Sequence, residues 1–165
     1  MRSPVKTDLD RIRAQCRKLV TRRALVSAGA AVVPIPGVDL GADVAILMKL
    51  LPAINDKFGL TPSQIEALSP NLQKIVVVGG ASMGLGLIGK ALSPDRILSL
   101  LLRAGAKRIA TKSVVKYVPF IGSAISASIS YYLLRRVANK HIDECYEVAG
   151  KIALENARSK AIHAT

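Results

Sequence analysis

The sequence predicts an all-α protein, a compact helical bundle of about six to seven helices. Half of the 165 residues are hydrophobic, but Trp is absent and aromatic residues make up only 4%. The apolar side chains are therefore mostly Leu, Ile, Val and Ala, interleaved with Gly and Ser, and this mixture favours close helix–helix packing over strands. Apolar residues also recur at the helical period, and capping or proline–glycine signals separate the periodic stretches.

The first predicted helix is basic and amphipathic, and it runs from about Asp8 to Arg23. Its apolar face repeats at the helical period, whereas most of the remaining surface carries positive charge. Such a helix can lie on an anionic bilayer or pack its apolar stripe into a core. The predicted membrane or anion contacts are Arg11, Arg13, Arg17, Lys18, Arg22 and Arg23. The alternative is an ordinary surface helix of a basic domain.

The length of the chain is typical of one domain that buries a substantial core. We therefore expect a single α-helical domain over residues 1–165. Within it, residues 1–23 are predicted to form the basic N-terminal helix, and residues 24–163 the apolar helical bundle.

Capping signals place several of the later helices. Asp39 is expected to cap a second helix that reaches about Phe58, and Gly59 is expected to stop it. Thr61 is expected to cap a third helix, because Pro follows at the first helical position and Gln at the third. Ser93 is expected to cap another. Further apolar helices are expected over about residues 72–92, 117–134 and 139–165.

Glycine and uncharged runs mark two of these helices. Residues 72–92 contain five glycines, and each costs a helix about 1 kcal/mol unless close packing compensates. Gly80 and Gly84 form a GxxxG pair, which lets two helix backbones approach closely. Residues 117–134 form the longest uncharged run, of eighteen residues, and its length makes it a marginal transmembrane candidate.

Two short stretches resemble each other, and their corresponding positions are 85 residues apart. Residues 33–37 read VPIPG and residues 118–122 read VPFIG, and a basic pair precedes each. We interpret them as the corners of two pseudo-repeated αα-hairpins. The alternative is coincidence in an apolar sequence of low diversity. The predicted corner residues are Pro34, Pro36, Gly37, Pro119 and Gly122.

The net charge of +13 favours partners that carry phosphate, whether lipid headgroups or nucleic acid. The high apolar content favours an anionic membrane surface, and the scarcity of aromatic stacking residues disfavours nucleic acid. The N-terminal residues are polar and mixed in charge, without the apolar segment of a secretion signal. We therefore expect a cytoplasmic protein that is peripheral to, or embedded in, the inner face of the membrane.

The sequence does not assemble an active site. Asp39 and Asp43 share a helix face and are expected to act as a cap and as an ion-pair partner. His141 and His163 are expected at the surface, and no cofactor or metal is expected. Two reduced thiols, Cys16 and Cys145, are expected. A C-terminal acidic group is expected to pair with Lys140 and Lys151 along its own helix; its members are Asp143, Glu144 and Glu147.

The order of several motifs resembles that of a known group of helical domains. PIPGVD at residues 34–39 is followed by Phe58-Gly59, then by a glycine-rich helix, and finally by VPFIGSAISASISYYLLRR at residues 118–136. This pattern is similar to the hydrophobic helical domain (YcjF-like) found attached to small bacterial GTPases, and to the EcsC family. The resemblance covers about Arg22 to Gly150. It implies a membrane-associated α-helical module that accompanies GTPases and has no established catalytic residues.

Three functions therefore remain open. The first is a non-enzymatic, membrane-associated scaffolding or regulatory module, and any GTPase would act in trans because the sequence has no P-loop motif. The second is a soluble adaptor or homo-oligomeric interaction domain. The third is a pore-forming or toxin-like helical protein in which residues 72–92 insert.

Overall fold

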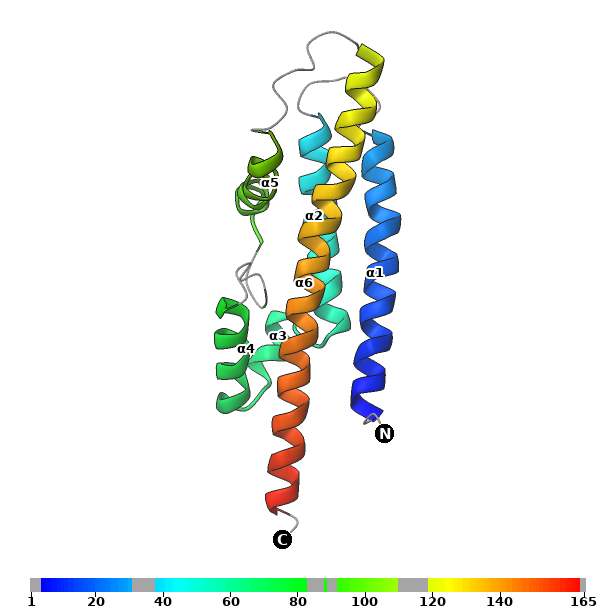
Figure 1. Ribbon diagram of the computed structural model, residues 1–165. Coiled ribbons are helices and arrows are strands. Elements are labelled where there is room, and N and C mark those ends of the chain that lie inside the picture. Colours follow the sequence, from blue (N-terminus) through cyan, green and yellow to red (C-terminus); the bar gives the residue numbers. More distant parts are fainter. Residues whose placement is uncertain (1–3, 31–37, 83–87, 89–91, 110–118, 164–165) are drawn as a thin grey trace. The chain divides into compact units, whose positions relative to one another are not determined.

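The structure, a computed structural model, describes residues 4–30, 38–82, 88, 92–109 and 119–163 (Figure 1). Over these residues the protein is all α and contains no strand, which confirms the predicted helical bundle. The described residues form six helices, at the lower end of the predicted number. They are α1 (Pro4–Ala30), α2 (Val38–Lys57), α3 (Pro62–Glu66), α4 (Pro70–Ser82), α5 (Pro94–Ile109) and α6 (Pro119–His163).

The chain divides into two compact units, and each is assembled from segments that are distant in the sequence. Unit 1 consists of residues 1–17, 52–91 and 141–165, and unit 2 of residues 18–51 and 92–140. The helices α1, α2 and α6 each contribute to both units. The division that the sequence suggested at residue 23 therefore falls inside α1, within the part of this helix that belongs to unit 2.

Local signals correctly place α3 and the end of α2. The only described residue with a left-handed backbone is Gly59, with a φ of 70°, and it follows α2 directly. Thr61 then caps α3 through a capping box: its side chain accepts from the backbone N–H of Gln64, and the Gln64 side chain accepts from the backbone N–H of Thr61. Asp39 requires a correction, because α2 begins at Val38 and Asp39 lies in its first turn.

The helix α6 corrects two predictions. The apolar run at 117–134 and the expected final helix from Asn139 belong to one continuous helix of 45 residues. No Gly or Pro interrupts residues 123–149, so nothing in the sequence ends the helix there. Pro119 occupies the first helical position, where its missing N–H costs nothing. Gly122 lies in the first turn of α6 and is therefore not a corner.

The pseudo-repeat is not confirmed. Gly37 directly precedes α2, whereas its counterpart Gly122 lies inside α6. The corner residues Pro34, Pro36 and Gly37 lie outside the described residues, as does Gly84.

None of the helices, as far as they are described, combines the length and apolarity that a membrane span requires.

Each unit buries an apolar set drawn from several helices. Unit 2 buries one stripe of α1 together with residues of α2, α5 and α6, including Val20, Leu47, Leu51, Leu101 and Leu134. Unit 1 buries residues of α1, α2, α4 and α6, including Cys16, Ile54, Val76, Ile142 and Val148.

Among the described glycines of unit 1, Gly79 of α4 lies closest to a neighbouring side chain. A Cβ atom added there would lie 2.9 Å from Cγ2 of Val148 on α6. At Gly80, the position that the GxxxG pattern indicated, the nearest contact of an added Cβ would be an ordinary 3.7 Å, to Ile88. Of these two glycines of α4, Gly79 is therefore the one at which the packing leaves no room for a side chain.

Candidate functional site

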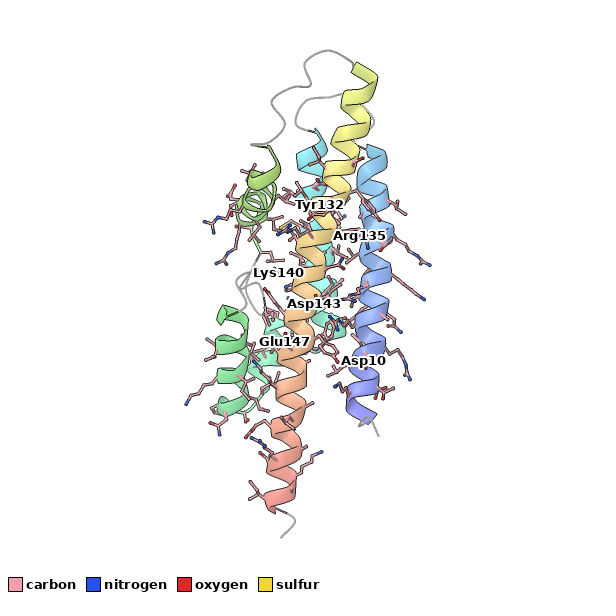
Figure 2. The ribbon with its side chains drawn as sticks, viewed as in Figure 1. Asp10, Tyr132, Arg135, Lys140, Asp143 and Glu147 are labelled. Carbon is pink, nitrogen blue, oxygen red and sulfur yellow. The ribbon has the colours of Figure 1, made fainter. Side chains whose placement is uncertain are left out.

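The six basic residues predicted on α1 fall into groups with different surroundings. Arg13 and Arg17 lie in unit 1 and bind one carboxylate on α6, that of Asp143 (Figure 2). Oδ1 of Asp143 accepts from Nη2 of Arg13 at 2.6 Å and from Nη2 of Arg17 at 3.0 Å. These two arginines therefore join α1 to α6. Asp143 was expected to pair along its own helix, and this prediction is wrong because the facing arginines of α1 offer two charged donors.

A tyrosine extends this contact between α1 and α6. The Arg13 guanidinium lies over the ring of Tyr146, 4.8 Å from its centroid. The Tyr146 hydroxyl donates to Oδ1 of Asp10 on α1 at 2.8 Å. We call the five side chains the α1–α6 clamp; they are Asp10, Arg13, Arg17, Asp143 and Tyr146. In each ion pair the side chains are one third to one half exposed, so solvent weakens it.

Three of the predicted residues lie in unit 2, and their side chains are exposed. These are Lys18, Arg22 and Arg23 of α1. Among the described residues, none of the three forms an ion pair with a carboxylate. Arg11, which lies in unit 1, is also exposed, and its ion pair with Asp8, at 3.5 Å, stays within the same helix. The structure thus separates the cations that hold α1 against α6 from those that face solvent.

Exposed apolar side chains lie beside these cations of unit 2. Leu25 is 59% exposed and Val26 is 65% exposed. Positions 18, 22, 25 and 26 follow the i, i+4, i+7 and i+8 pattern of one helix face, and position 23 adjoins it. The opposite face of α1 supplies the buried Val20 and Ala24. We call the exposed set the basic–apolar edge; its members are Lys18, Arg22, Arg23, Leu25 and Val26.

The net charge is concentrated in the same unit. The sequence of unit 2 contains 13 Lys and Arg and 3 Asp and Glu, a net charge of +10. Unit 1 contains 11 Lys and Arg and 8 Asp and Glu, a net charge of +3. Most of the overall charge of +13 therefore belongs to the unit that carries the basic–apolar edge.

Two Tyr–Arg pairs on α6 add to the basic character of unit 2. Arg135 donates to the hydroxyl of Tyr131 at 2.8 Å, and Arg136 donates to the hydroxyl of Tyr132 at 2.9 Å. Each guanidinium also lies over the ring of its tyrosine. Neither pair was predicted from the sequence, although the i, i+4 spacing of Tyr and Arg in YYLLRR places their side chains side by side on a helix.

A buried polar cluster lies in unit 1, distinct from the charged surfaces. His141 and Cys145 of α6 have no exposed surface, and Asn55 of α2 is 5% exposed. Nε2 of His141 donates to Oδ1 of Asn55 at 2.8 Å, because an amide oxygen can only accept. The Cys145 thiol donates to the same oxygen at 3.4 Å. The prediction of a surface histidine is thus wrong for His141, because α6 turns this position towards α2.

The environment of the cluster favours a structural role. Burial raises the pKa of the Cys145 thiol well above its ordinary value, and the nearby Glu144 and Cys16 raise it further. A thiol in such surroundings stays protonated, whereas nucleophilic catalysis and metal binding use the thiolate. No group of three or more metal-ligating side chains comes together among the residues that the structure describes.

Comparisons with known proteins identify no relative. No family model, no curated protein and no solved structure matches the chain. The resemblance to the YcjF-like and EcsC families therefore remains a prediction.

Proposed function

We propose that the protein is a non-enzymatic, membrane-associated helical module that contacts an anionic bilayer through the basic–apolar edge of unit 2. The observation that carries this proposal is the position of Leu25 and Val26, both more than half exposed, beside Lys18, Arg22 and Arg23. Apolar side chains in that position favour neither free solvent nor a purely ionic partner. The interface of an anionic bilayer accepts both kinds of side chain.

The magnitudes support a reversible surface contact. Each Lys or Arg near an anionic leaflet contributes about 1 kcal/mol, so three contribute about 3 kcal/mol. Full burial of a Leu or Val side chain contributes about 1.5–3 kcal/mol, and partial immersion contributes less. The charge of unit 2 adds long-range attraction. The sum describes peripheral binding that weakens as salt is raised.

The scaffolding or regulatory role follows from the lack of a catalytic constellation in the sequence and from the resemblance to GTPase-associated modules. A module that binds the inner face of the membrane can hold a second protein there, and the resemblance indicates a GTPase that acts in trans. A pull-down tests this role: binding of the protein to a GTPase is compared between the two nucleotide states of that GTPase. Binding that does not change with the nucleotide state would argue against a regulatory partnership of this kind.

Co-sedimentation with vesicles tests the membrane contact. Vesicles of phosphatidylcholine with about 30% phosphatidylserine imitate an anionic leaflet, and vesicles of phosphatidylcholine alone are the reference. We expect the variant Lys18→Glu/Arg22→Glu to lose about tenfold or more in affinity for the anionic vesicles, since it removes two attractions and adds two repulsions. Leu25→Ser/Val26→Ser should bind less at every salt concentration.

The control is Lys74→Glu/Lys160→Glu, which changes the net charge equally but uses exposed lysines of unit 1. We expect it to retain most of the binding. Equal losses for both double reversals would show that only net charge matters, and the proposed edge would be wrong. Entrapped dye that leaks on binding would instead favour insertion of residues 72–92.

A further inference from the structure

An apolar groove lies in unit 1, between the N-terminal part of α1 and the C-terminal part of α6. Its volume is about 560 Å³. Leu9 of α1 forms one wall, and Gly150, Ala153, Leu154 and Ala157 of α6 form the other. Lys6 and Glu147 lie at its polar margin. Figure 2 shows Glu147 on α6, about one helical turn after Asp143.

The wall formed by α6 has the pattern of a helix-packing seam. Gly150, Ala153 and Ala157 follow the i, i+3 and i+7 spacing of one face, and small residues there let another helix approach closely. Leu154 lies on the same face and is 58% exposed. Such a face suits knobs-into-holes packing, because the large side chain is a knob and the small residues beside it form the hole for the knob of a facing helix.

The sequence of this face is complementary to itself when two copies run in opposite directions. If an antiparallel pair is centred between Ala153 and Leu154, Ala153 of one copy lies level with Leu154 of the other. In the same register Gly150 lies level with Ala157 of the other copy. Each larger side chain thus meets a smaller one, and the two-fold axis repeats the contact.

The charges beside the groove favour the same arrangement. Glu147 and Arg158 lie on the same edge of the α6 face, at opposite ends of the small-residue seam. An antiparallel pair places Glu147 of each copy within one helical turn of Arg158 of the other, so two attractive contacts form. A parallel pair would instead place like charges level with each other. Arg158 is held only weakly in the single chain, since its contact with Glu155 is 4.0 Å long and its side chain is 70% exposed.

We infer that this groove is a self-association surface, in which α6 of a second copy of the chain packs antiparallel to α6. The seam spans only about three helical turns, so the interface is small, and small interfaces belong to weak and transient contacts. The inference does not depend on the membrane proposal, because its residues belong to unit 1 and the basic–apolar edge belongs to unit 2.

Sedimentation velocity of the full chain, from about 1 to about 200 μM, measures the association. We expect a monomer–dimer equilibrium within this range. Leu154→Glu places two carboxylates at the centre of the dimer, and it should raise the dissociation constant at least about tenfold. Val77→Glu is the matched control, because Val77 is 68% exposed in unit 1 but lies on α4, outside the groove.

A charge exchange tests the orientation of the two helices. Glu147→Arg and Arg158→Glu should each weaken the dimer, because each change produces like charges across the interface. The double variant Glu147→Arg/Arg158→Glu should restore the dimer, since the attraction returns with its signs exchanged. Circular dichroism of each variant checks that the fold is intact.

Several results would overturn the inference. One is a monomer at every concentration, and another is an association that Leu154→Glu does not weaken while the variant stays folded. A double charge exchange that fails to restore a weakened dimer would exclude the antiparallel register. The membrane proposal has a separate readout, because the reversal of Lys18 and Arg22 should leave sedimentation unchanged.

Discussion

Arg13 of α1 donates two hydrogen bonds to a single carboxylate oxygen of Asp143 on α6, at 2.6 Å from Nη2 and 3.0 Å from Nε. The two residues are 130 positions apart in the sequence. The same guanidinium lies over the ring of Tyr146. One side chain therefore supplies both an ionic and an aromatic contact between the two ends of the chain.

Because of these contacts, replacing Arg13 should destabilise the protein more than replacing Arg11 on the same helix. Arg13→Ala removes the contacts with Asp143 and Tyr146 and should lower the free energy of unfolding by about 1–2 kcal/mol, since the partly exposed ion pair and the cation–π contact are each modest. Arg11→Ala, which removes only an exposed contact, should change it by less than about 0.5 kcal/mol. Urea titration measures both values. Equal effects would show that the clamp contributes nothing specific.

The buried thiol predicts a loss of stability at alkaline pH. The pKa of Cys145 in the folded protein lies above its ordinary value of 9.0, chiefly because of burial. Above that value the unfolded chain releases the thiol proton while the folded chain retains it. The unfolded state then binds fewer protons, so the free energy of unfolding falls as pH rises, by up to about 1.4 kcal/mol per pH unit. Below that value the contribution of this thiol is constant.

Urea titrations from about pH 8 to about pH 10 measure this slope. Cys145→Ala should have a shallower slope, because it removes one of the two thiol contributions; Cys16, whose pKa burial also raises, keeps the other. A variant whose slope equals that of the parent protein would show that folding does not raise the pKa of Cys145.

The two neighbouring glycines of α4 predict opposite responses to alanine. Alanine is favoured over glycine in a helix by about 1 kcal/mol. Gly80→Ala should therefore stabilise the protein, because the added Cβ makes an ordinary contact at 3.7 Å. At Gly79 the added Cβ would lie 2.9 Å from Val148, and such overpacking costs about 1–3 kcal/mol.

The midpoint temperature of thermal unfolding should therefore be lower for Gly79→Ala than for Gly80→Ala. The double variant Gly79→Ala/Val148→Ala should lose less stability than the sum of its two single changes, because the smaller side chain relieves the contact. Strict additivity of the two changes would mean that α4 and α6 do not approach each other as described.

The sequence predicted those features that depend on a few adjacent residues. The cap at Thr61 and the stop at Gly59 follow from local hydrogen bonding and backbone conformation, and both are found. The continuity of α6 was missed because the prediction divided an uninterrupted helix at a change in polarity. The burial of His141 and the role of Asp143 depend on residues of α2 and α1 that are far away in the sequence. Periodicity within one helix contains no information about such partners.

The basic–apolar edge was likewise predictable only in part. The basic residues of α1 were predicted from charge and helical periodicity, but nothing in the sequence separates Arg13 and Arg17 from Lys18 and Arg22. That separation depends on Asp143, which occupies the facing helix only after folding. Leu25 and Val26 belong to the residues that were predicted to form the apolar bundle, and their exposure depends on which face of α1 the core covers.

The discontinuous composition of unit 1 has a consequence for biosynthesis. Residues 1–17 belong to the same unit as residues 141–165, so the start of α1 meets its partners on α6 only after residues 141–165 have left the ribosome. Unit 2 contains no residue beyond 140. The emerging chain can therefore complete unit 2 first, before Arg13 and Arg17 can pair with Asp143. During that interval all the positive charge of α1 is accessible, so nascent chains should bind anionic surfaces more strongly than the finished protein does.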